Sequence, residues 1–170
     1  MREVGRHDHV ELDLSEVVAT ATHDFALDHP DRPLTEDIAP SVRIRARRDY
    51  VERLLTNALT NVVRHTAPTD PLRVTLRANP TTLRIEDGGP GLPAASYGQR
   101  LEQFRRFDPS RSRASGGSGL GMSIMADVTD ALGGTLTTEP SELGGLALVF
   151  TFPPLAAGLS GVPGAAPVGS

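Results

Sequence analysis

Short stretches in which apolar and polar residues alternate recur along the chain, and a period of two is typical of β-strands that bury one face. Two such stretches between residues 33 and 46 lie close together and predict a β-hairpin. Residues 71–78 and 82–86 predict a second hairpin, whose turn is Ala78-Asn79-Pro80-Thr81. The pattern indicates about seven strands in all. The remaining ones are predicted at 10–14, 135–138 and 146–152.

Three longer segments place their apolar residues at helical spacing. The first follows Ser15, which suits an N-cap position, and ends before Pro30. The second runs from Asp49 to about Thr66, and the third covers 119–132 and ends at a pair of glycines. At about 100° per residue, the second helix separates into two faces. Its apolar face holds Leu55, Leu59, Val62 and Val63, and its polar face holds Asn57, Asn61 and Arg64.

These elements predict a single α/β domain. Three helices and a mixed sheet suit a two-layer arrangement in which the helices cover one face of the sheet. The domain is expected to span residues 10–152, preceded by a linker at 1–9. Residues 153–170 are mostly Gly, Pro and Ala with little to bury, so they are expected to be disordered.

Composition narrows the possible chemistry. The 170 residues are 38% hydrophobic and 22% charged, which is typical of a globular domain, and no run approaches the ~18 apolar residues of a membrane span. The chain has no cysteine, which excludes disulfides, thiolate metal sites and a cysteine nucleophile. All 17 Lys+Arg residues are arginine, which excludes a Walker-type or Schiff-base lysine. A net charge of −4 gives no overall attraction to nucleic acid.

The polar face of the second helix offers ligands for a metal and for phosphate. Asn57 and Asn61 lie one turn apart and present two amide carbonyls, and such hard oxygens are acceptable ligands for Mg2+. An isolated pair of this kind is more often a solvated helix face. Arg64, three residues beyond Asn61, favours the functional interpretation because a guanidinium can meet phosphate oxygens.

A glycine-rich turn follows the strand predicted at 82–86. In Asp87-Gly88-Gly89-Pro90-Gly91, the ionised carboxylate only accepts hydrogen bonds. It therefore matches the exocyclic amino group of adenine and repels the carbonyl that guanine carries there. Gly89 and Gly91 would let a planar base lie against the backbone. By itself, the segment is also compatible with an ordinary Asp-Gly turn.

Residues 87–117 form a long segment with only a weak helical patch at 101–107, and a loop of this length is typical of a lid or a binding loop. It ends in Gly116-Gly117-Ser118-Gly119-Leu120-Gly121, which leads into the third helix. Free backbone amides at a helix N-terminus form an anion site, so a polyphosphate could rest there; a flexible hinge is the alternative. The absence of lysine excludes a Walker loop, and the position after a long loop argues against a Rossmann fingerprint.

Taken together and in this order, the motifs resemble those of the ATP-binding domain of bacterial sensor histidine kinases, within the GHKL ATPase superfamily. Leu55 to Asn61 is similar to the N box, Asp87 to Gly91 to the first glycine box, Phe104-Arg105-Arg106-Phe107 to the F box, and Gly117 to Gly121 to the second glycine box. The resemblance covers about residues 10–152. It implies a two-layer α/β sandwich of the Bergerat type, with a mostly antiparallel sheet, three helices on one face and a long ATP lid.

The resemblance also implies roles for individual residues. Asn61 would hold the Mg2+ that bridges the triphosphate, and Asp87 would bind the adenine amino group. Contacts to the nucleotide are expected from Asn61, His65, Asp87, Gly89, Gly91, Gly117, Ser118, Gly119, Leu120 and Gly121. Catalytic roles fall to Asn57 and Arg64, with a possible helper among the lid residues Arg105, Arg106, Arg111 and Arg113.

Two positions depart from the family pattern. The residue after Arg64 is more often Tyr and here is His65, which either stacks on the nucleotide or lies on the surface. Pro90 replaces the commoner middle residue of the first glycine box and should stiffen this turn. Neither change removes a required donor or ligand.

Asn57 bears on the type of reaction. In gyrase, Hsp90 and MutL-type relatives and in anti-sigma serine kinases, a glutamate at this place acts as a base. Asn cannot accept a proton, whereas a neutral imidazole acceptor already offers a lone pair. The residues therefore favour transfer of the γ-phosphoryl group of Mg-ATP to histidine. The alternatives are a nucleotide-binding regulatory module without transfer and an anti-sigma-type serine kinase.

The acceptor histidine is expected outside this chain. His7, His9 and His23 lack the rest of the acceptor signature of the family. The chain is interpreted as the catalytic part of a homodimeric kinase. The dimerisation domain, with the acceptor histidine, is expected to precede it and to pass the phosphoryl group to a response regulator. The resemblance implies a cytoplasmic domain without direct membrane contact, in a parent protein anchored in the membrane by other segments. No nucleic-acid partner is expected.

Overall fold

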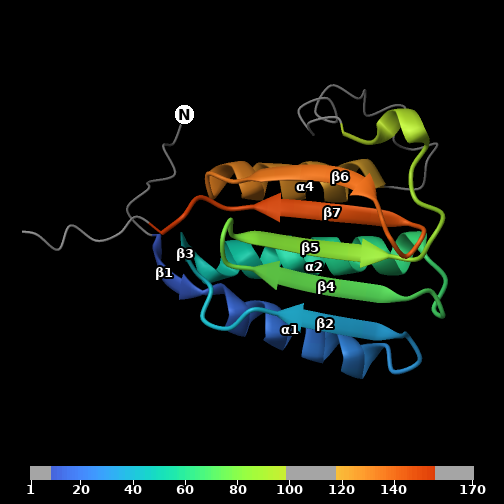
Figure 1. Ribbon diagram of the computed structural model, residues 1–170, viewed down its shortest axis with the longest axis horizontal. Helices are drawn as coiled ribbons and strands as arrows, with labels where there is room; N and C mark the ends of the chain where they lie inside the picture. Colours follow the sequence, from blue (N-terminus) through green and yellow to red (C-terminus); the bar gives the residue numbers. More distant parts are fainter. Residues whose placement is uncertain (1–8, 99–117, 156–170) are drawn as a thin grey trace, which may run out of the picture.

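The computed structural model describes residues 9–98 and 118–155. In these residues, three α-helices lie on one face of a five-stranded sheet of order β2-β4-β5-β7-β6 (Figure 1). None of the helices in the described ranges has the length and apolar character of a membrane span. The elements are β1 (Val10–Asp13), α1 (Leu14–Asp28), β2 (Leu34–Ile38), β3 (Arg43–Ala46), α2 (Arg48–His65), β4 (Leu72–Arg77), β5 (Thr82–Asp87), the 3-10 helix η2 (Ala94–Ser96), α4 (Ser118–Ala131), β6 (Thr135–Pro140) and β7 (Leu146–Thr151).

The predicted fold class is confirmed, but one predicted pairing is wrong. β4 and β5 form the hairpin expected at residues 71–86, with Leu76 opposite Leu83. The segments between residues 33 and 46 do not form a hairpin, because β2 pairs in parallel with β4 and β3 pairs antiparallel with β1. Alternation identifies a strand and its buried face, whereas the choice of partner depends on which elements meet in the tertiary structure.

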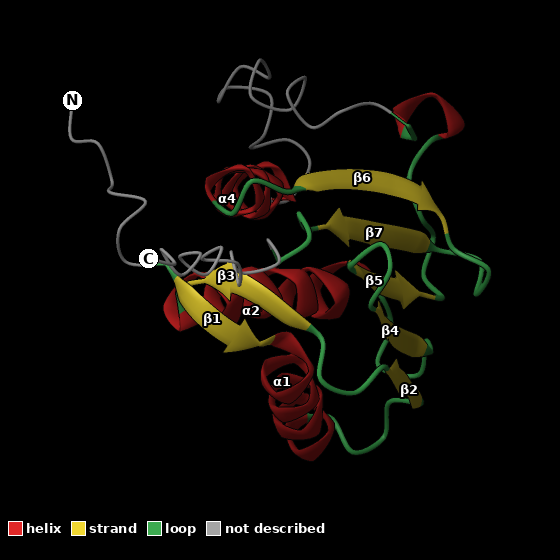
Figure 2. Cartoon of the chain, turned by 60° about the vertical axis from the view of Figure 1, so that its left-hand side comes forward, coloured by secondary structure: helices red, strands yellow, loops and turns green. Residues whose placement is uncertain are grey.

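β1 and β3 form a two-stranded ribbon apart from the main sheet (Figure 2). The N-cap of the helix that follows β1 is Asp13 and not Ser15, since Asp13 Oδ1 accepts from the Glu16 amide at 3.1 Å. Ser15 is buried in the first turn instead. Its hydroxyl donates to the Ala39 carbonyl at 2.6 Å and accepts from the Val42 amide at 2.9 Å. This serine therefore ties α1 to the segment between β2 and β3.

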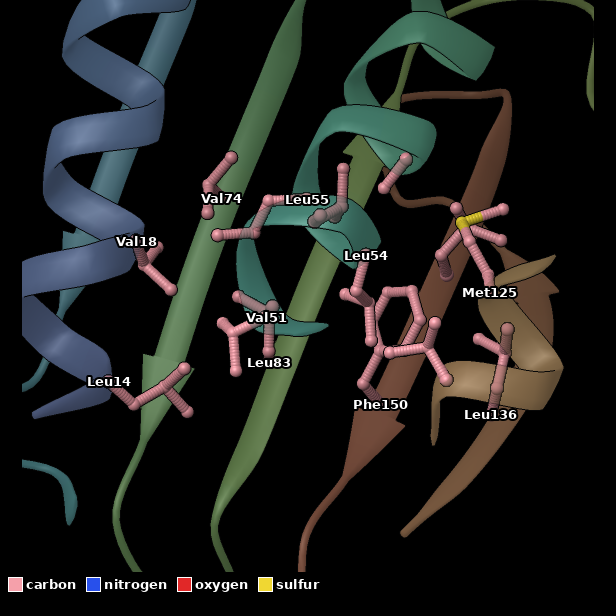
Figure 3. Packing of buried hydrophobic residues seen from close by; sticks show 14 of the residues in the cluster. Leu14, Val18, Val51, Leu54, Leu55, Val74, Leu83, Met125, Leu136 and Phe150 are labelled. Carbon is pink, nitrogen blue, oxygen red and sulfur yellow. The ribbon is translucent and has the colours of Figure 1, made fainter. Parts of the chain in front are cut away.

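The hydrophobic core lies between the helices and the sheet, with α2 at its centre (Figure 3). Leu54 and Leu55 of α2 pack in one cluster with Phe150 of β7 and Met125 of α4. Each of these four residues is at most 1% exposed. The position of α2 is thus set by close packing from both sides, which makes it a rigid support for the residues at its C-terminal end.

Two residues of α2 do not follow the predicted faces. Val63, expected on the apolar face, is 38% exposed, whereas Asn61, expected on the polar face, is only 7% exposed. Because α2 is flanked by both α1 and α4, its buried arc is wide and centred near Val51 and Ala58. Asn61 consequently lies at the edge of the core.

The face of the sheet opposite the helices carries a network of charges. Glu86 of β5 is 2% exposed and lies 3.6 Å from Arg73 and 3.2 Å from Arg84. Each arginine has a second carboxylate partner nearer the surface. Side chains of a strand alternate between faces, so Glu86 and its neighbour Asp87 point to opposite sides of the sheet.

Candidate functional site

The C-terminal half of α2 carries several predicted site residues. Asn57 donates its side-chain NH2 to the Arg53 carbonyl at 2.7 Å, and its amide oxygen has no hydrogen-bond donor among the described residues. Asn61 is buried, yet no side-chain hydrogen bond joins it to another described residue. Arg64 is exposed and forms no ion pair within the described ranges. This helix end therefore offers a largely buried amide and a nearby exposed cation to a ligand.

His65, the last residue of α2, is half-buried. Its Nε2 atom is buried and has no hydrogen-bond partner in the described part of the chain. Stacking of this ring on a nucleotide stays a prediction.

Asp87 ends β5 and is 5% exposed. Its Oδ1 accepts from the Gly89 amide at 2.9 Å and from the Leu146 amide at 3.2 Å, while no described residue donates to Oδ2. Burial raises the pKa of Asp87 above its usual value and the charge of Asp70 adds to the rise, whereas the two backbone donors and the charge of Arg32 oppose it. One carboxylate oxygen is thus held by the backbone, and the other is open to a donor.

Gly145, just before β7, is part of this arrangement, and the sequence analysis missed it. A Cβ at Gly145 would overlap Oδ1 of Asp87 and lie 2.6 Å from the Gly89 amide nitrogen. Its own amide donates to the Asp87 carbonyl at 3.1 Å. Only a residue without a side chain leaves room for the bond from Leu146 to the carboxylate. The Gly144-Gly145 pair directly before a predicted strand was the available signal.

Gly89 and Gly91 are crowded by atoms of the protein itself. A Cβ at Gly89 would lie 2.6 Å from Cγ2 of Thr66. Gly91 has φ +68°, and a Cβ there would lie 2.5 Å from the Tyr97 hydroxyl. Internal packing therefore accounts for both glycines, and their predicted role beneath a base stays a prediction.

Arg32, in the connection between α1 and β2, is a second feature that the sequence patterns missed. It is the only arginine in the described ranges that is buried, at 8% exposed. Its Nη1 donates to Thr66 Oγ1 at 2.8 Å and to the Asp70 carbonyl at 3.0 Å. An arginine in a loop, outside every motif, gives no sequence signal of burial.

Part of the second glycine box can be located. α4 begins at Ser118, so the prediction of a helix start in this glycine-rich segment is confirmed, with Ser118, Gly119 and Leu120 in its first turn. A Cβ at Gly121 would meet nothing within 4 Å. Outside the described residues lie Gly117, the F box at 104–107 and the lid arginines Arg105, Arg106, Arg111 and Arg113.

The motifs meet at one end of the sheet. The C-terminus of α2 adjoins the first glycine box, because a Cβ at Gly89 would contact Thr66 and would lie 3.3 Å from the His65 carbonyl. β7 begins at this end, where Leu146 bonds to Asp87. β5 and β6 run in the same direction, so β6 starts at the end of the sheet opposite Asp87. α4 ends beside the start of β6, and it therefore begins at the end where Asp87 lies (Figure 1). The Asn face of α2, the aspartate and the start of α4 therefore border one region.

Comparison with known proteins identifies the family of this chain. Residues 46–156 match the family described as "Histidine kinase-, DNA gyrase B-, and HSP90-like ATPase". The match covers more than half of the chain, and the protein therefore belongs to this ATPase family. Its similarity to named proteins narrows the type further, to the catalytic ATP-binding domain of sensor histidine kinases.

Sensor protein RstB of Escherichia coli is 41% identical over 103 residues, which are 61% of this chain and 24% of RstB. Sensor-type histidine kinase PrrB of Mycobacterium tuberculosis is 32% identical over 148 residues, which are 86% of this chain and 32% of PrrB. The chain thus spans about a quarter to a third of the length of these curated relatives.

Two solved structures share the fold and part of the sequence. The ATP-binding domain of PrrB from Mycobacterium tuberculosis has a TM-score of 0.67 at 28% identity, covering 88% of this chain and 99% of that one. The mycobacterial sensor histidine kinase MprB has a TM-score of 0.68 at 25% identity, covering 85% of this chain and 97% of that one.

Proposed function

We propose that this domain binds Mg-ATP where Asp87, the end of α2 and the start of α4 meet, and transfers the γ-phosphoryl group to a histidine on a separate dimerisation domain. The observation that carries this proposal is the asymmetry of the Asp87 carboxylate. Two backbone amides engage Oδ1, so Oδ2 is left as an acceptor in a low-dielectric site. The exocyclic amino group of adenine is a donor, whereas guanine presents a carbonyl at the same edge, which an acceptor repels. The arrangement therefore selects adenine.

Asn61 is proposed to hold the Mg2+ ion. Mg2+ is usually bound through one or two protein oxygens together with substrate phosphates, and an amide oxygen at the edge of the core suits that role. When bound, the ion would neutralise charge on the phosphates during transfer. Arg64, three residues further along the helix and exposed, is proposed to contact a phosphate oxygen. Backbone amides at the start of α4 are proposed to bind the remaining phosphate charge.

The residue at position 57 favours histidine as the acceptor. The NH2 group of Asn57 is bonded to the Arg53 carbonyl, and an amide cannot remove a proton from water or from a serine hydroxyl. A neutral imidazole nitrogen can attack the γ-phosphorus with its own lone pair. The bond between that phosphorus and the oxygen bridging to the β-phosphate then breaks, and ADP leaves with the electron pair.

The partners of the reaction are proposed from the sensor histidine kinases that the chain resembles. The acceptor histidine would lie on the dimerisation domain of a homodimeric parent kinase, and a response regulator would receive the phosphoryl group. This domain would be cytoplasmic, with the parent protein anchored in the membrane by other segments. Within the described ranges, His9 packs edge-on against Tyr50, with ring centroids 6.3 Å apart, which suits a structural role better than phosphorylation.

The test combines the purified chain with a separately produced acceptor helix hairpin and ATP labelled at the γ-phosphate. Acid-labile label should appear on the hairpin, and it should be lost when the hairpin histidine is replaced by glutamine or when Asp87→Asn is used. Tight ATP binding without label transfer would contradict the kinase proposal and indicate a regulatory module. Acid-stable label on a serine would indicate a serine kinase instead.

A further inference from the structure

We propose that Arg32 is a positioning residue for the base end of the nucleotide site: it holds the end of α2 against the first glycine turn and so keeps Asp87 aimed at the adenine amino group. The inference rests on the proposed function, because it takes Asp87 as the group that receives adenine. Nothing in the sequence motifs includes Arg32.

The contacts of Arg32 join three segments of the chain. The residue itself lies between α1 and β2, and its buried Nη1 donates to Thr66 Oγ1 at 2.8 Å and to the Asp70 carbonyl at 3.0 Å. Thr66 follows α2 directly, and Asp70 precedes β4. One guanidinium nitrogen therefore holds together the connection between α1 and β2 and both ends of the connection between α2 and β4.

Thr66 transmits this contact to Asp87. Its hydroxyl also donates to the Val62 carbonyl at 2.6 Å, so bonds on both sides fix the orientation of the side chain. The Thr66 methyl group packs against Gly89, where a Cβ would lie only 2.6 Å from it. The Gly89 amide in turn donates to Asp87 Oδ1 at 2.9 Å. A displaced Thr66 would thus shift the turn that orients the carboxylate.

Charge adds to the geometric effect. The Arg32 cation lowers the pKa of Asp87, against the rise that burial causes, and Asp70 raises it. In the described ranges, Asp70 and Arg32 are the charged side chains that act on the pKa of Asp87. Glu86, its neighbour in β5, points to the opposite face of the sheet, and β7 contributes only the Leu146 amide. His65, at the end of α2, and Tyr97, whose hydroxyl accepts from the Leu92 amide at 2.7 Å, are further titratable side chains near this turn.

A purely structural role explains Arg32 poorly. Its Nε atom is buried and has no hydrogen-bond partner among the described residues. A buried donor without a partner destabilises the fold, and an apolar residue of similar length would fill the same space without it. An apolar replacement would also lose the effect of the cation on the pKa of Asp87.

The experiment measures binding of ATP, of adenosine and of inorganic triphosphate with Mg2+ to the full chain, by calorimetry from pH 5 to pH 8. The variants are Arg32→Met, which removes the charge and the donors, and Arg32→Lys, which keeps the charge without the planar group. Arg77→Met is the matched control, since Arg77 is exposed at the far end of β4 and pairs with Asp37. Comparison with the unmodified chain at each pH isolates the effect of the substitution.

For Arg32→Met we expect a loss of about tenfold or more in affinity for both ATP and adenosine, with triphosphate binding unchanged. In Arg32→Met, the fall in ATP affinity on acidification should begin at a higher pH than in the unmodified chain. In Arg32→Lys, it should begin close to the pH seen in the unmodified chain. Unchanged affinity, or a loss that is equal at every pH, overturns the inference. If Arg32→Met does not fold, Thr66→Val decides: a loss confined to the adenine-containing ligands supports the inference, and unchanged affinities overturn it.

The inference and the proposed function fail in different ways. If the unmodified chain binds no ATP, or if Asp87→Asn leaves binding intact, the proposed nucleotide site is wrong. If the unmodified chain binds ATP and Asp87→Asn weakens it while the Arg32 and Thr66 variants behave like Arg77→Met, only the role of Arg32 is wrong.

Discussion

The carboxylate of Asp87 accepts a hydrogen bond at 3.2 Å from the backbone amide of Leu146, 59 residues further along the chain. The same oxygen accepts from Gly89, two residues away. One local and one distant donor thus fix the orientation of the side chain, and no described residue donates to the second oxygen.

Asp87→Asn should abolish adenine recognition without unfolding the domain. The amides of Gly89 and Leu146 require an acceptor, so the asparagine should place its oxygen there and turn its NH2 group toward the ligand. Two donors would then face each other, and we expect ATP affinity to fall by about 100-fold or more. GTP should bind better relative to ATP than before, because guanine carries a carbonyl at this edge. Calorimetric titrations with both nucleotides test this, and unchanged ATP affinity would remove Asp87 from the site.

The pH dependence should run in opposite directions for binding and for folding. Burial raises the pKa of Asp87, so its protonation starts at a less acidic pH than for an exposed aspartate, and ATP affinity should fall as pH decreases through this raised value. The folded protein binds this proton more tightly than the unfolded chain does. At neutral pH, the ionised Asp87 therefore lowers the free energy of unfolding. This loss of stability disappears as the pH falls from the raised pKa of the folded protein to the lower pKa of the unfolded chain. The difference in stability between the unmodified chain and Asp87→Asn, measured by urea denaturation across pH, isolates the second effect.

Gly145→Ala should disrupt the site and the fold together. The new Cβ would overlap the Asp87 carboxylate and crowd the Gly89 amide, so either β7 or the glycine turn must shift. We expect a loss of about 2–4 kcal/mol of stability, in the range of severe overpacking, together with weaker ATP binding. Gly144→Ala is the control in the same turn: it meets no atom within 4 Å and suffers only the strain of φ +104°. Gly145→Ala should unfold at a lower temperature than Gly144→Ala. The reverse order of unfolding temperatures would contradict the crowding argument.

Asn61→Ala should abolish the Mg2+ dependence of ATP binding. The amide at the edge of the core has no described internal partner, so its removal should leave the fold largely intact while taking away the proposed metal ligand. ATP affinity with Mg2+ should then equal the affinity in EDTA. Asn57→Ala is the matched control one turn earlier, and it should keep the Mg2+ dependence of binding. Retention of that dependence in Asn61→Ala would place the metal elsewhere.

Glu86→Gln should reduce stability without changing nucleotide affinity. The buried carboxylate lies between two arginines on the face of the sheet opposite the site. Its replacement should cost about 1–3 kcal/mol, since the buried side chain loses its ion pairs with Arg73 and Arg84. Glu142→Gln removes a carboxylate whose side chain is 77% exposed and should change stability by less than about 1 kcal/mol. A large loss of ATP affinity in Glu86→Gln would show that the two faces of the sheet are not independent.

Several elements of the fold and site were predictable because short-range rules govern them. The turn between β4 and β5 can be recognised from its own residues, and α2 shows the helical period of apolar residues over 18 residues. The carboxylate after β5 and the glycines at the start of α4 stand next to their elements in the chain. Each of these features depends on residues only a few positions apart, so a local pattern is sufficient.

Predictions that needed a distant partner failed or were never made. Ser15 has the side chain of an N-cap, but the contacts of its hydroxyl with Ala39 and Val42 take it into the interior. The strands between residues 33 and 46 alternate correctly, but each pairs with a strand elsewhere. Val63 has apolar character, yet the packing of α1 and α4 on α2 places the buried arc away from it.

By itself, the sequence determined which groups could carry the chemistry: the aspartate after a strand, the asparagines one helical turn apart and the glycine-rich helix start. Only the tertiary structure decided how these groups are oriented, through Leu146 and Gly145 at the carboxylate and through Arg32 and Thr66 behind the glycine turn. The reason is physical. Residue type and local period fix what a side chain can donate or accept, whereas burial and the direction of a lone pair depend on contacts between segments that meet only after folding.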